Sequence, residues 1–339
     1  MPGSATIDLE PYFDLHRQEL TGYCYRMLGS PFDADDAVQE TLVRAWRASG
    51  RFEQRSSVRT WLYRIATNVC LDMLRRRKRR VRPMELGPSR SPDLRHLDQG
   101  LGEESWVLPT PDRAVLGDGA DPAEAAVLRD SVRLAFVAAL QHLPAKQRAA
   151  VLLCDVLRWP AAETAELLDT SVASVNSALQ RARATLADLD AGERPTPADP
   201  EQAALLDRYL EAFERYDVPA LVTLLREDAV QSMPPYAMWL EGAENIGAWM
   251  LGPGLPCEGS RLLPAAANGC PAFGQYRVDP AGGHAPWALQ ILEIVDGRIV
   301  GLQFFLDADH LFPLFGLPLH LPEGPPAEGP LPSGPEGDG

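Results

Sequence analysis

Residues 161–186 read AAETAELLDTSVASVNSALQRARATL and contain two helical patterns separated by a short turn. The first pattern ends at Leu168, and the second runs from Val172 to Leu186 with Ser171 as a suitable N-cap. Ala165 is small, as a residue must be where two crossing helices approach closely. The inner face of the second helix would consist of Val172, Val175 and Leu179. This spacing predicts a helix-turn-helix, whose second helix can enter a DNA major groove.

The outward face of that second helix is polar, and its side chains can donate hydrogen bonds to phosphates or base edges. It consists of Ser174, Asn176, Ser177, Gln180, Arg181 and Arg183. An ordinary helical hairpin with a solvated polar face would show the same pattern. This stretch alone leaves both interpretations open.

A second helical pattern runs from about Val58 to Arg79 and ends in six consecutive basic residues, 75–80. Basic residues hold phosphates, and aromatic residues can stack on unstacked bases, so the combination suits melted DNA. The residues that could do so are Trp61, Tyr63, Arg64, Asn68, Arg75 and Arg76. The alternative is a core tryptophan and a solvated helix end that the helix dipole favours.

The stretch DADDAVQETLVRAW, residues 33–46, predicts an earlier helix with Asp33 as its N-cap. Its apolar face would run from Ala37 to Trp46. Its opposite face is acidic and polar and could meet a basic protein surface, or be solvated. That face consists of Asp35, Asp36, Gln39 and Glu40.

Composition places the chain among soluble globular proteins. Of its 339 residues, 45% are hydrophobic and 23% are charged, and the net charge is −15. The charge is uneven, because residues 1–82 hold 15 Lys and Arg against 10 Asp and Glu, whereas residues 201–339 hold 6 against 19. Such asymmetry indicates different partners for different parts of the chain.

Several function classes are disfavoured by what the sequence lacks. The five cysteines form no CxxC pair and have no zinc-ligand spacing to histidine, so we expect reduced thiols and no metal site. Neither a secretory signal nor a membrane-length apolar run is present, and we expect a cytoplasmic protein with no membrane contact.

Residues 201–320 predict a mixed α+β domain. Helical patterns cover 201–216, 219–226 and 241–250, and strand patterns cover 261–268, 272–278, 287–295 and 298–306. Asp296-Gly297 between two apolar runs is a strong hairpin signal.

Three segments, in this order, resemble a bacterial sigma-70 family transcription initiation factor of the extracytoplasmic-function group. Residues 33–46 resemble the region 2 helix that docks on RNA polymerase, and residues 56–80 resemble the part of region 2 that melts and reads −10 DNA. Residues 143–186 resemble region 4, which reads −35 DNA. Together these three segments cover about a quarter of the chain.

This resemblance implies roles for the residues already singled out. The acidic residues of 33–46, Asp35 included, become contacts to core RNA polymerase, and the aromatic-basic set of 58–80 becomes the −10 reader. A loop around 54–58 would hold a flipped promoter base. The polar face of 172–186 becomes the −35 reader. VNSALQRAR carries less positive charge than this helix does in many relatives, which predicts either weaker −35 affinity or more dependence on the rest of the complex.

A further resemblance concerns the third domain. Residues 209–230 and 288–307 resemble the SnoaL-like group, whose fold is the α+β cone of nuclear transport factor 2. The resemblance implies regulation in cis, and a small-molecule ligand could occupy the pocket of the cone. Acid-base chemistry in that pocket would use one of Asp228, His284, Asp307, Asp309 or His310. Nothing fixes a catalytic pair among them, so we expect no catalysis and no cofactor.

The expected organisation is multidomain, with all-α regions followed by an α+β cone. It consists of region 2 (1–82), an acidic linker (83–122), region 4 (123–190), a second linker (191–200), the SnoaL-like domain (201–320) and a tail (321–339). The expected function is a sigma factor that binds core RNA polymerase and promoter DNA. A stand-alone DNA-binding regulator with a ligand-sensing domain, or a cone-fold enzyme fused to a DNA-binding region, are the alternatives.

Overall fold

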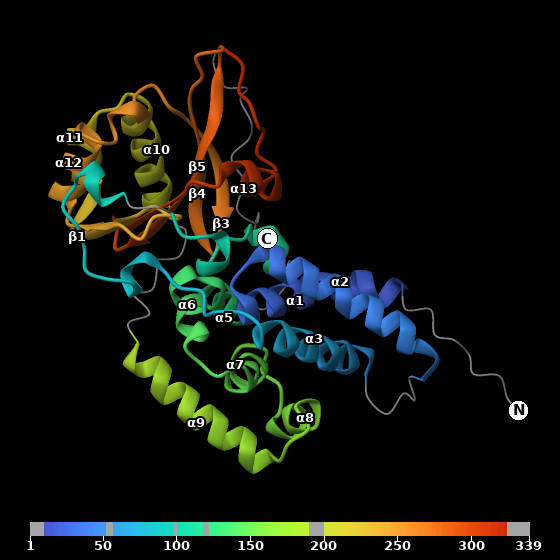
Figure 1. Ribbon diagram of the computed structural model, residues 1–339. Helices are drawn as coiled ribbons and strands as arrows, with labels where there is room; N and C mark the ends of the chain where they lie inside the picture. Colours follow the sequence, from blue (N-terminus) through green and yellow to red (C-terminus); the bar gives the residue numbers. More distant parts are fainter. Residues whose placement is uncertain (1–9, 52–56, 98–99, 118–121, 190–199, 324–339) are drawn as a thin grey trace, which may run out of the picture. The chain divides into compact units, whose positions relative to one another are not determined.

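The computed structural model describes residues 10–51, 57–97, 100–117, 122–189 and 200–323 (Figure 1). The loop expected to hold a flipped base falls largely on residues 52–56, outside these ranges, as does most of the second linker. Two units form: residues up to 85 together with 101–194, and residues 86–100 together with those from 195 onward. Part of the expected first linker, of which residues 86–97 are described, therefore packs with the second unit.

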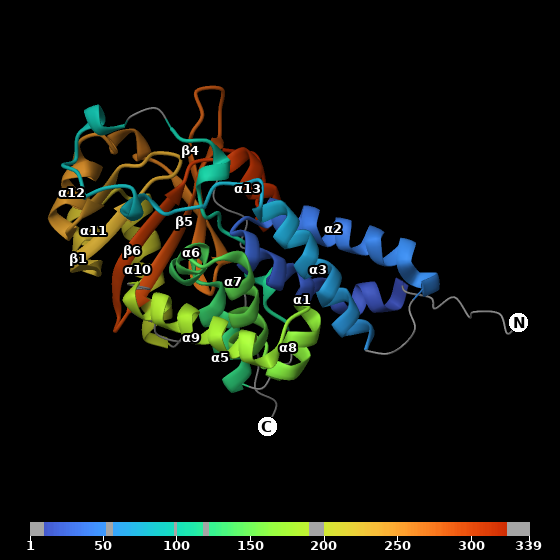
Figure 2. The same ribbon diagram turned by 60° about the horizontal axis from the view of Figure 1, so that its bottom comes forward.

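The first unit is helical where it is described. Its helices are α1 (Glu10–Leu28), α2 (Pro31–Ala48), α3 (Val58–Leu74), α4 (Asp112–Val115), α5 (Pro122–Val132), α6 (Leu134–Gln141), α7 (Ala145–Val151), α8 (Ala161–Leu167) and α9 (Val172–Asp188). Short 3₁₀ turns are η1 (Ser49–Arg51), η2 (Pro83–Glu85) and η4 (Glu103–Ser105), and a π-helical turn, η5 (Leu152–Val156), extends α7. Figure 2 shows α1, α2 and α3 lying together, with α7 and α8 near α3.

Two helix ends differ from the prediction. α2 begins at Pro31, and its N-cap is Ser30, whose Oγ accepts from the Asp33 backbone N–H at 3.4 Å. The prediction of Asp33 as N-cap was wrong because its carboxylate is buried and pairs with Arg80 at 2.8 Å. α3 ends at Leu74, before the basic run, where like charges three and four residues apart would repel one another.

The second unit is the expected α+β domain. Its sheet has the order β2-β1-β6-β5-β4-β3, in which β1 and β6 are parallel and the other pairs are antiparallel. The strands are β1 (Leu225–Ser232), β2 (Trp239–Glu241), β3 (Arg261–Ala267), β4 (Cys270–Val278), β5 (His284–Val295) and β6 (Arg298–Phe305). The helices are α10 (Pro200–Glu214), α11 (Val218–Leu224), α12 (Ala243–Leu251) and α13 (Ala308–Phe315), with 3₁₀ turns η3 (Leu94–His96) and η6 (Leu255–Cys257).

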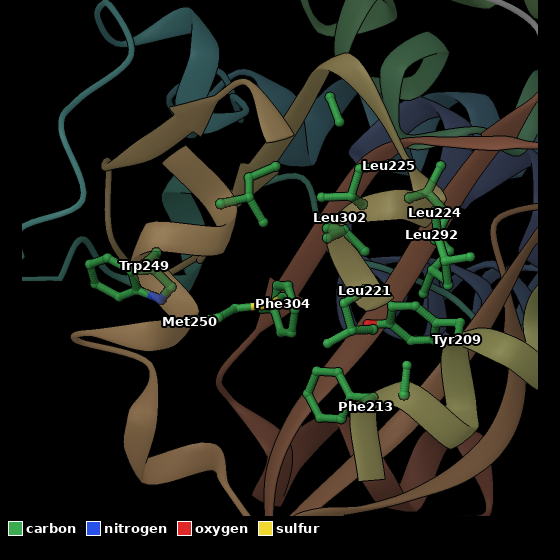
Figure 3. Packing of buried hydrophobic residues seen from close by; sticks show 14 of the residues in the cluster. Tyr209, Phe213, Leu221, Leu224, Leu225, Trp249, Met250, Leu292, Leu302 and Phe304 are labelled. Atoms are coloured by element: carbon green, nitrogen blue, oxygen red, sulfur yellow. The ribbon is translucent and has the colours of Figure 1, made fainter. Parts of the chain in front are cut away.

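The core of this unit lies between one face of the sheet and the helices α10, α11 and α12, while α13 covers the other face (Figure 1). Figure 3 shows this core, to which Tyr209 and Phe213 of α10 and Leu292 and Leu302 of the sheet all belong. The hairpin prediction is confirmed, because Asp296 and Gly297 join β5 to β6 with φ of +48° and +68°.

Strands β1 and β2 were not predicted. Residues 219–226 were expected to be helical, but α11 ends at Leu224 and the chain passes directly into β1. Within the described ranges, every helix is either too short or too polar to cross a bilayer.

Candidate nucleic-acid interface

Helices α8 and α9 form the predicted helix-turn-helix. Ser171 is the N-cap of α9, and its Oγ accepts a hydrogen bond from the Ser174 backbone N–H at 3.2 Å. Val175 and Leu179 are buried on the inner face as predicted. Val172, the first residue of α9, is 43% exposed, so the apolar face is one turn shorter than expected.

The outward face of α9 is open to solvent. All six residues predicted there are exposed: Ser174, Asn176, Ser177, Gln180, Arg181 and Arg183. Arg183 makes a two-pronged ion pair with Asp155, at 3.0 and 2.6 Å, and this hydrogen bonding raises the pKa of Arg183. Arg181 has no ion-pair partner among the described residues. The face therefore presents amide, hydroxyl and guanidinium donors on one rigid helix.

The residues predicted on α3 fall into three environments. Asn68 is exposed on the helix, and Arg75 and Arg76 are exposed just after it ends. Trp61 and Arg64 are half-buried. Tyr63 is fully buried.

Tyr63 belongs to the core of the first unit in this conformation. Its ring lies 5.2 Å from that of Tyr23 and 5.0 Å from that of Trp159, and its hydroxyl donates to Glu19 Oε2 at 3.3 Å. Burial raises the pKa of Tyr63 far above its ordinary value. A base contact by Tyr63 would require α3 to separate from the segment that carries Trp159.

The helix-turn-helix side of the unit lies directly on α3. Arg64 Nη2 pairs with Glu166 Oε1 of α8 at 3.0 Å. The Arg59 guanidinium lies 5.3 Å from the ring centroids of Tyr63 and of Trp159. Part of the predicted −10 surface is therefore covered by the predicted −35 module.

The basic run after α3 divides into a buried residue and exposed ones. Arg80 is 5% exposed, pairs with Asp33 at 2.8 Å, and donates to the carbonyls of Glu103 and Trp106 at 2.8 and 2.7 Å. By contrast, residues 75–79 are exposed. Arg80 is therefore a structural residue, and its position in a run of similar basic residues could not show this.

The predicted acidic surface on α2 is present. Asp35, Asp36 and Gln39 are exposed, and Glu40 is half-exposed with a hydrogen bond from Arg44 Nε at 2.7 Å. Trp46, expected on the buried face, is instead 70% exposed, because it lies past Ala45 at the edge of the packed stripe.

The apolar segment 106–108 of the expected linker packs on the helical unit itself. Trp106 and Leu108 are at most 4% exposed and cluster with Val81. Tyr25 donates its hydroxyl proton to the Leu108 carbonyl at 2.8 Å. This segment is therefore a fixed part of the first unit.

The second unit contains a cavity of about 230 Å³. None of the five acid-base candidates named from the sequence lines it: Asp228, His284, Asp307, Asp309 and His310 lie elsewhere. Asp228 instead hydrogen-bonds Arg226, which lowers the pKa of that carboxyl, and His310 Nδ1 lies 2.8 Å from Asp307 Oδ1. Across the described ranges, no three His, Cys, Asp or Glu residues gather as a metal site would require.

Three family models match this chain, one for each of the three domains expected from the sequence. Residues 12–80 match the family model of sigma-70 region 2, residues 133–186 match that of sigma-70 region 4, and residues 206–302 match that of the SnoaL-like domain. The matches coincide with α1–α3, with α6–α9, and with the second unit from α10 to β6.

Two relatives match this chain over most of its length. The chain is 46% identical over 326 residues to the ECF RNA polymerase sigma factor SigG of Mycobacterium tuberculosis, covering 93% of this chain and 84% of the relative. It is 27% identical over 310 residues to SigJ of the same organism, covering 88% and 91%. The crystal structure of SigJ matches with a TM-score of 0.57 at 25% identity, over 91% of this chain and 99% of that one.

Proposed function

Because this chain belongs to the extracytoplasmic function (ECF) group of RNA polymerase sigma factors, we propose that it binds core RNA polymerase and directs it to particular promoters. The observation that carries this proposal is the outward face of α9, where six donor side chains are exposed on a capped, well-packed helix. A recognition helix of this kind reads base edges in the major groove.

The residues of α9 suit different parts of a −35 contact. Asn176 and Gln180 carry amides that can bond an adenine edge through two hydrogen bonds. Arg181 and Arg183 suit phosphates, and a phosphate that replaced Asp155 would release Arg183 from its internal ion pair. The modest positive charge of this face makes its affinity depend on the rest of the polymerase complex.

Reading of the −10 element is assigned to α3 and the basic run that follows it. Asn68, Arg75 and Arg76 are accessible as the structure stands. Tyr63 and Arg64 are released for DNA only after α8 and the Trp159 segment move off α3, because Tyr63 packs on Trp159 and Arg64 pairs with Glu166. Trp61 is half-buried on the same helix. The contact to be broken includes one partly exposed ion pair, Arg64 with Glu166, which contributes only about 0–1 kcal/mol.

Docking on core polymerase is assigned to α2. Asp35, Asp36, Gln39 and Glu40 supply an acidic surface that complements a basic one. The exposed Trp46 lies farther along the same helix, and exposed tryptophans are frequent anchors of protein interfaces. We accordingly propose that the protein acts where the polymerase acts, in the cytoplasm.

The SnoaL-like domain is assigned a regulatory role in cis and no catalysis. Among the described residues that line its cavity there is no Asp, Glu or His. Tyr216 and Cys257 also line it, but burial raises the pKa of both groups and keeps them neutral. We assign it a binding role.

Complex formation with core RNA polymerase tests the proposal. The purified full chain is mixed with core enzyme and the bound fraction is measured, with Asp36→Arg combined with Glu40→Arg as the disrupting variant. Arg208→Ala, an exposed change on α10, is the matched control. Capture of wild type and control but not of the charge-reversed variant supports the assignment. Tight duplex binding by the full chain with no capture would identify a stand-alone regulator instead.

A further inference from the structure

The cavity of the second unit has mainly apolar walls. They include Phe213 of α10, Trp249 and Met250 of α12, and Phe304 of β6. These four residues come from three different elements of the domain, and Figure 3 shows Met250 pointing toward Phe304, with Trp249 on one side and Phe213 on the other. A volume of about 230 Å³ accommodates a molecule of roughly eight heavy atoms, given that one water occupies about 30 Å³ of liquid.

One polar group in the wall lacks a partner. Gln231 is 2% exposed, and its Oε1 makes no hydrogen bond, while its Nε2 has only Met233 Sδ at 3.9 Å. A buried amide left unpaired costs free energy that a ligand donor would recover. Gln231 therefore marks where a ligand's polar group would lie.

A second buried amide in the wall is already satisfied. Gln275 Nε2 donates to Ser260 Oγ at 3.1 Å, and its Oε1 accepts from Gln290 Nε2 at 2.9 Å. Gln290 Oε1 in turn accepts from the Tyr209 hydroxyl at 2.7 Å. This chain of hydrogen bonds fixes Gln275, which leaves Gln231 as the amide open to a ligand.

Among the described residues that line the cavity, Arg277 is the one with a formal charge, and its side chain already has partners. Its Nε donates to the Pro256 carbonyl at 2.8 Å, and its guanidinium lies 4.1 Å from the centroid of the Trp287 ring. Burial raises the pKa of the Cys257 thiol, which keeps it neutral and unreactive. These features favour a neutral ligand over an anion.

Part of the wall comes from the segment that connects the two helical regions. Leu94 and Leu97 line the cavity, and Leu97 also packs against the core of the domain. Upstream, the segment runs along the edge strand β2: the Arg90 N–H donates to the Trp239 carbonyl at 2.9 Å, and Trp239 Nε1 donates to the Gly87 carbonyl at 2.8 Å.

We propose that this cavity binds a small, neutral, mainly apolar molecule bearing one hydroxyl group, and that the molecule holds segment 86–97 on the domain. The hydroxyl bonds Gln231, and it satisfies the amide in either orientation because a hydroxyl both donates and accepts. Leu94 and Leu97 contact the ligand only while the segment is docked, so ligand binding and docking strengthen each other. A consequence for transcription, namely that the ligand restrains movement of the helical regions, rests on the proposed function; the binding itself does not.

The test uses a matched pair of probes, 4-ethylphenol and ethylbenzene, which differ by the hydroxyl alone. Calorimetric titration of the full chain is expected to show 4-ethylphenol binding about tenfold more tightly than ethylbenzene. The variant Gln231→Leu is expected to abolish that preference and to keep ethylbenzene binding. Equal affinities in the wild type, or no saturable binding of either probe, would overturn the proposal.

The coupling is tested with the segment. Leu94→Ala combined with Leu97→Ala is expected to weaken both probes severalfold, whereas Leu86→Ala, an exposed leucine of the same segment outside the cavity, leaves both unchanged. Conversely, 4-ethylphenol is expected to slow amide hydrogen exchange in residues 87–97. Unchanged exchange at saturation would refute the coupling. Core polymerase takes no part in these measurements, so failure of the proposed function would leave their outcome untouched.

Discussion

Replacing Arg80 with Met tests whether the basic run after α3 contains both a structural and a DNA-binding part. Met keeps most of the side-chain volume and removes the guanidinium. The change leaves the buried Asp33 carboxylate with Arg77 as its remaining partner. It also leaves the Trp106 carbonyl without its donor, while the Glu103 carbonyl keeps only the hydrogen bond from the Trp106 backbone N–H.

The magnitude follows from these contacts. Removing one partner of a buried ion pair costs about 3–5 kcal/mol, and the lower end applies because Arg77 still contacts Asp33. A loss of about 3 kcal/mol lowers the melting temperature of a domain of this size by roughly 6–12 °C. Arg80 also donates to the Trp106 carbonyl, so the segment around Trp106 is expected to become less ordered in the variant.

Arg76→Met is the matched control, because Arg76 belongs to the same run and is exposed. It is expected to change stability by less than about 0.5 kcal/mol. In scanning calorimetry of the full chains, Arg80→Met should shift the transition of the helical unit and leave that of the α+β unit in place. In promoter binding by the polymerase complex, Arg76→Met should reduce the salt slope by about one. Equal melting temperatures for the two variants would refute the division of the run.

Three further predictions concern other surfaces. Asp36→Arg combined with Glu40→Arg should weaken binding to core polymerase most at low salt, because salt screens surface charges. The affinity is measured by titration at low and at high salt. An equal loss of affinity at both salt concentrations would contradict an electrostatic contact. Asn176→Ala or Gln180→Ala should reduce the discrimination between bases at one −35 position by about 1–3 kcal/mol, measured as binding to a promoter library. Unchanged discrimination between bases would mean that α9 does not read them. Burial raises the pKa values of Tyr63 and Tyr209 above the unfolded value of about 10, so their contribution to stability is whole below that pH and is lost as the pH rises above it. In a pH titration, tyrosinate absorbance reports ionisation and circular dichroism reports the fold. Tyr63 and Tyr209 should ionise only as the fold is lost. Ionisation of all tyrosines while the fold remains intact would contradict this prediction.

Local signals in the sequence predicted several features because the chemistry is local. Ser171 as N-cap and the alternation of Val175 and Leu179 with polar residues depend only on helix geometry. The Asp296-Gly297 turn follows from the left-handed backbone that both residues tolerate. The fold class and the family followed from several such signals in order.

Features that depend on distant partners were missed. β1 has the sequence LREDAVQS, and its three charged residues do not suggest a strand. It is a strand because it pairs with β6, which lies about 70 residues away in the chain. Arg80 cannot be told from its neighbours until Asp33 is placed beside it. Segment 86–97 carries no sustained period because its partners, such as Trp239, belong to another domain. Tyr63 stands among basic residues in the sequence, yet its ring packs against Trp159.

Transcription by reconstituted enzyme tests the central claim most directly. Core RNA polymerase with and without the full chain transcribes fragmented genomic DNA of the source organism, and the 5′ ends of the RNA are sequenced. The account predicts new start sites that share one −10 and one −35 element, and their loss with Asn176→Ala combined with Gln180→Ala. Start sites identical to those of core enzyme alone would contradict it.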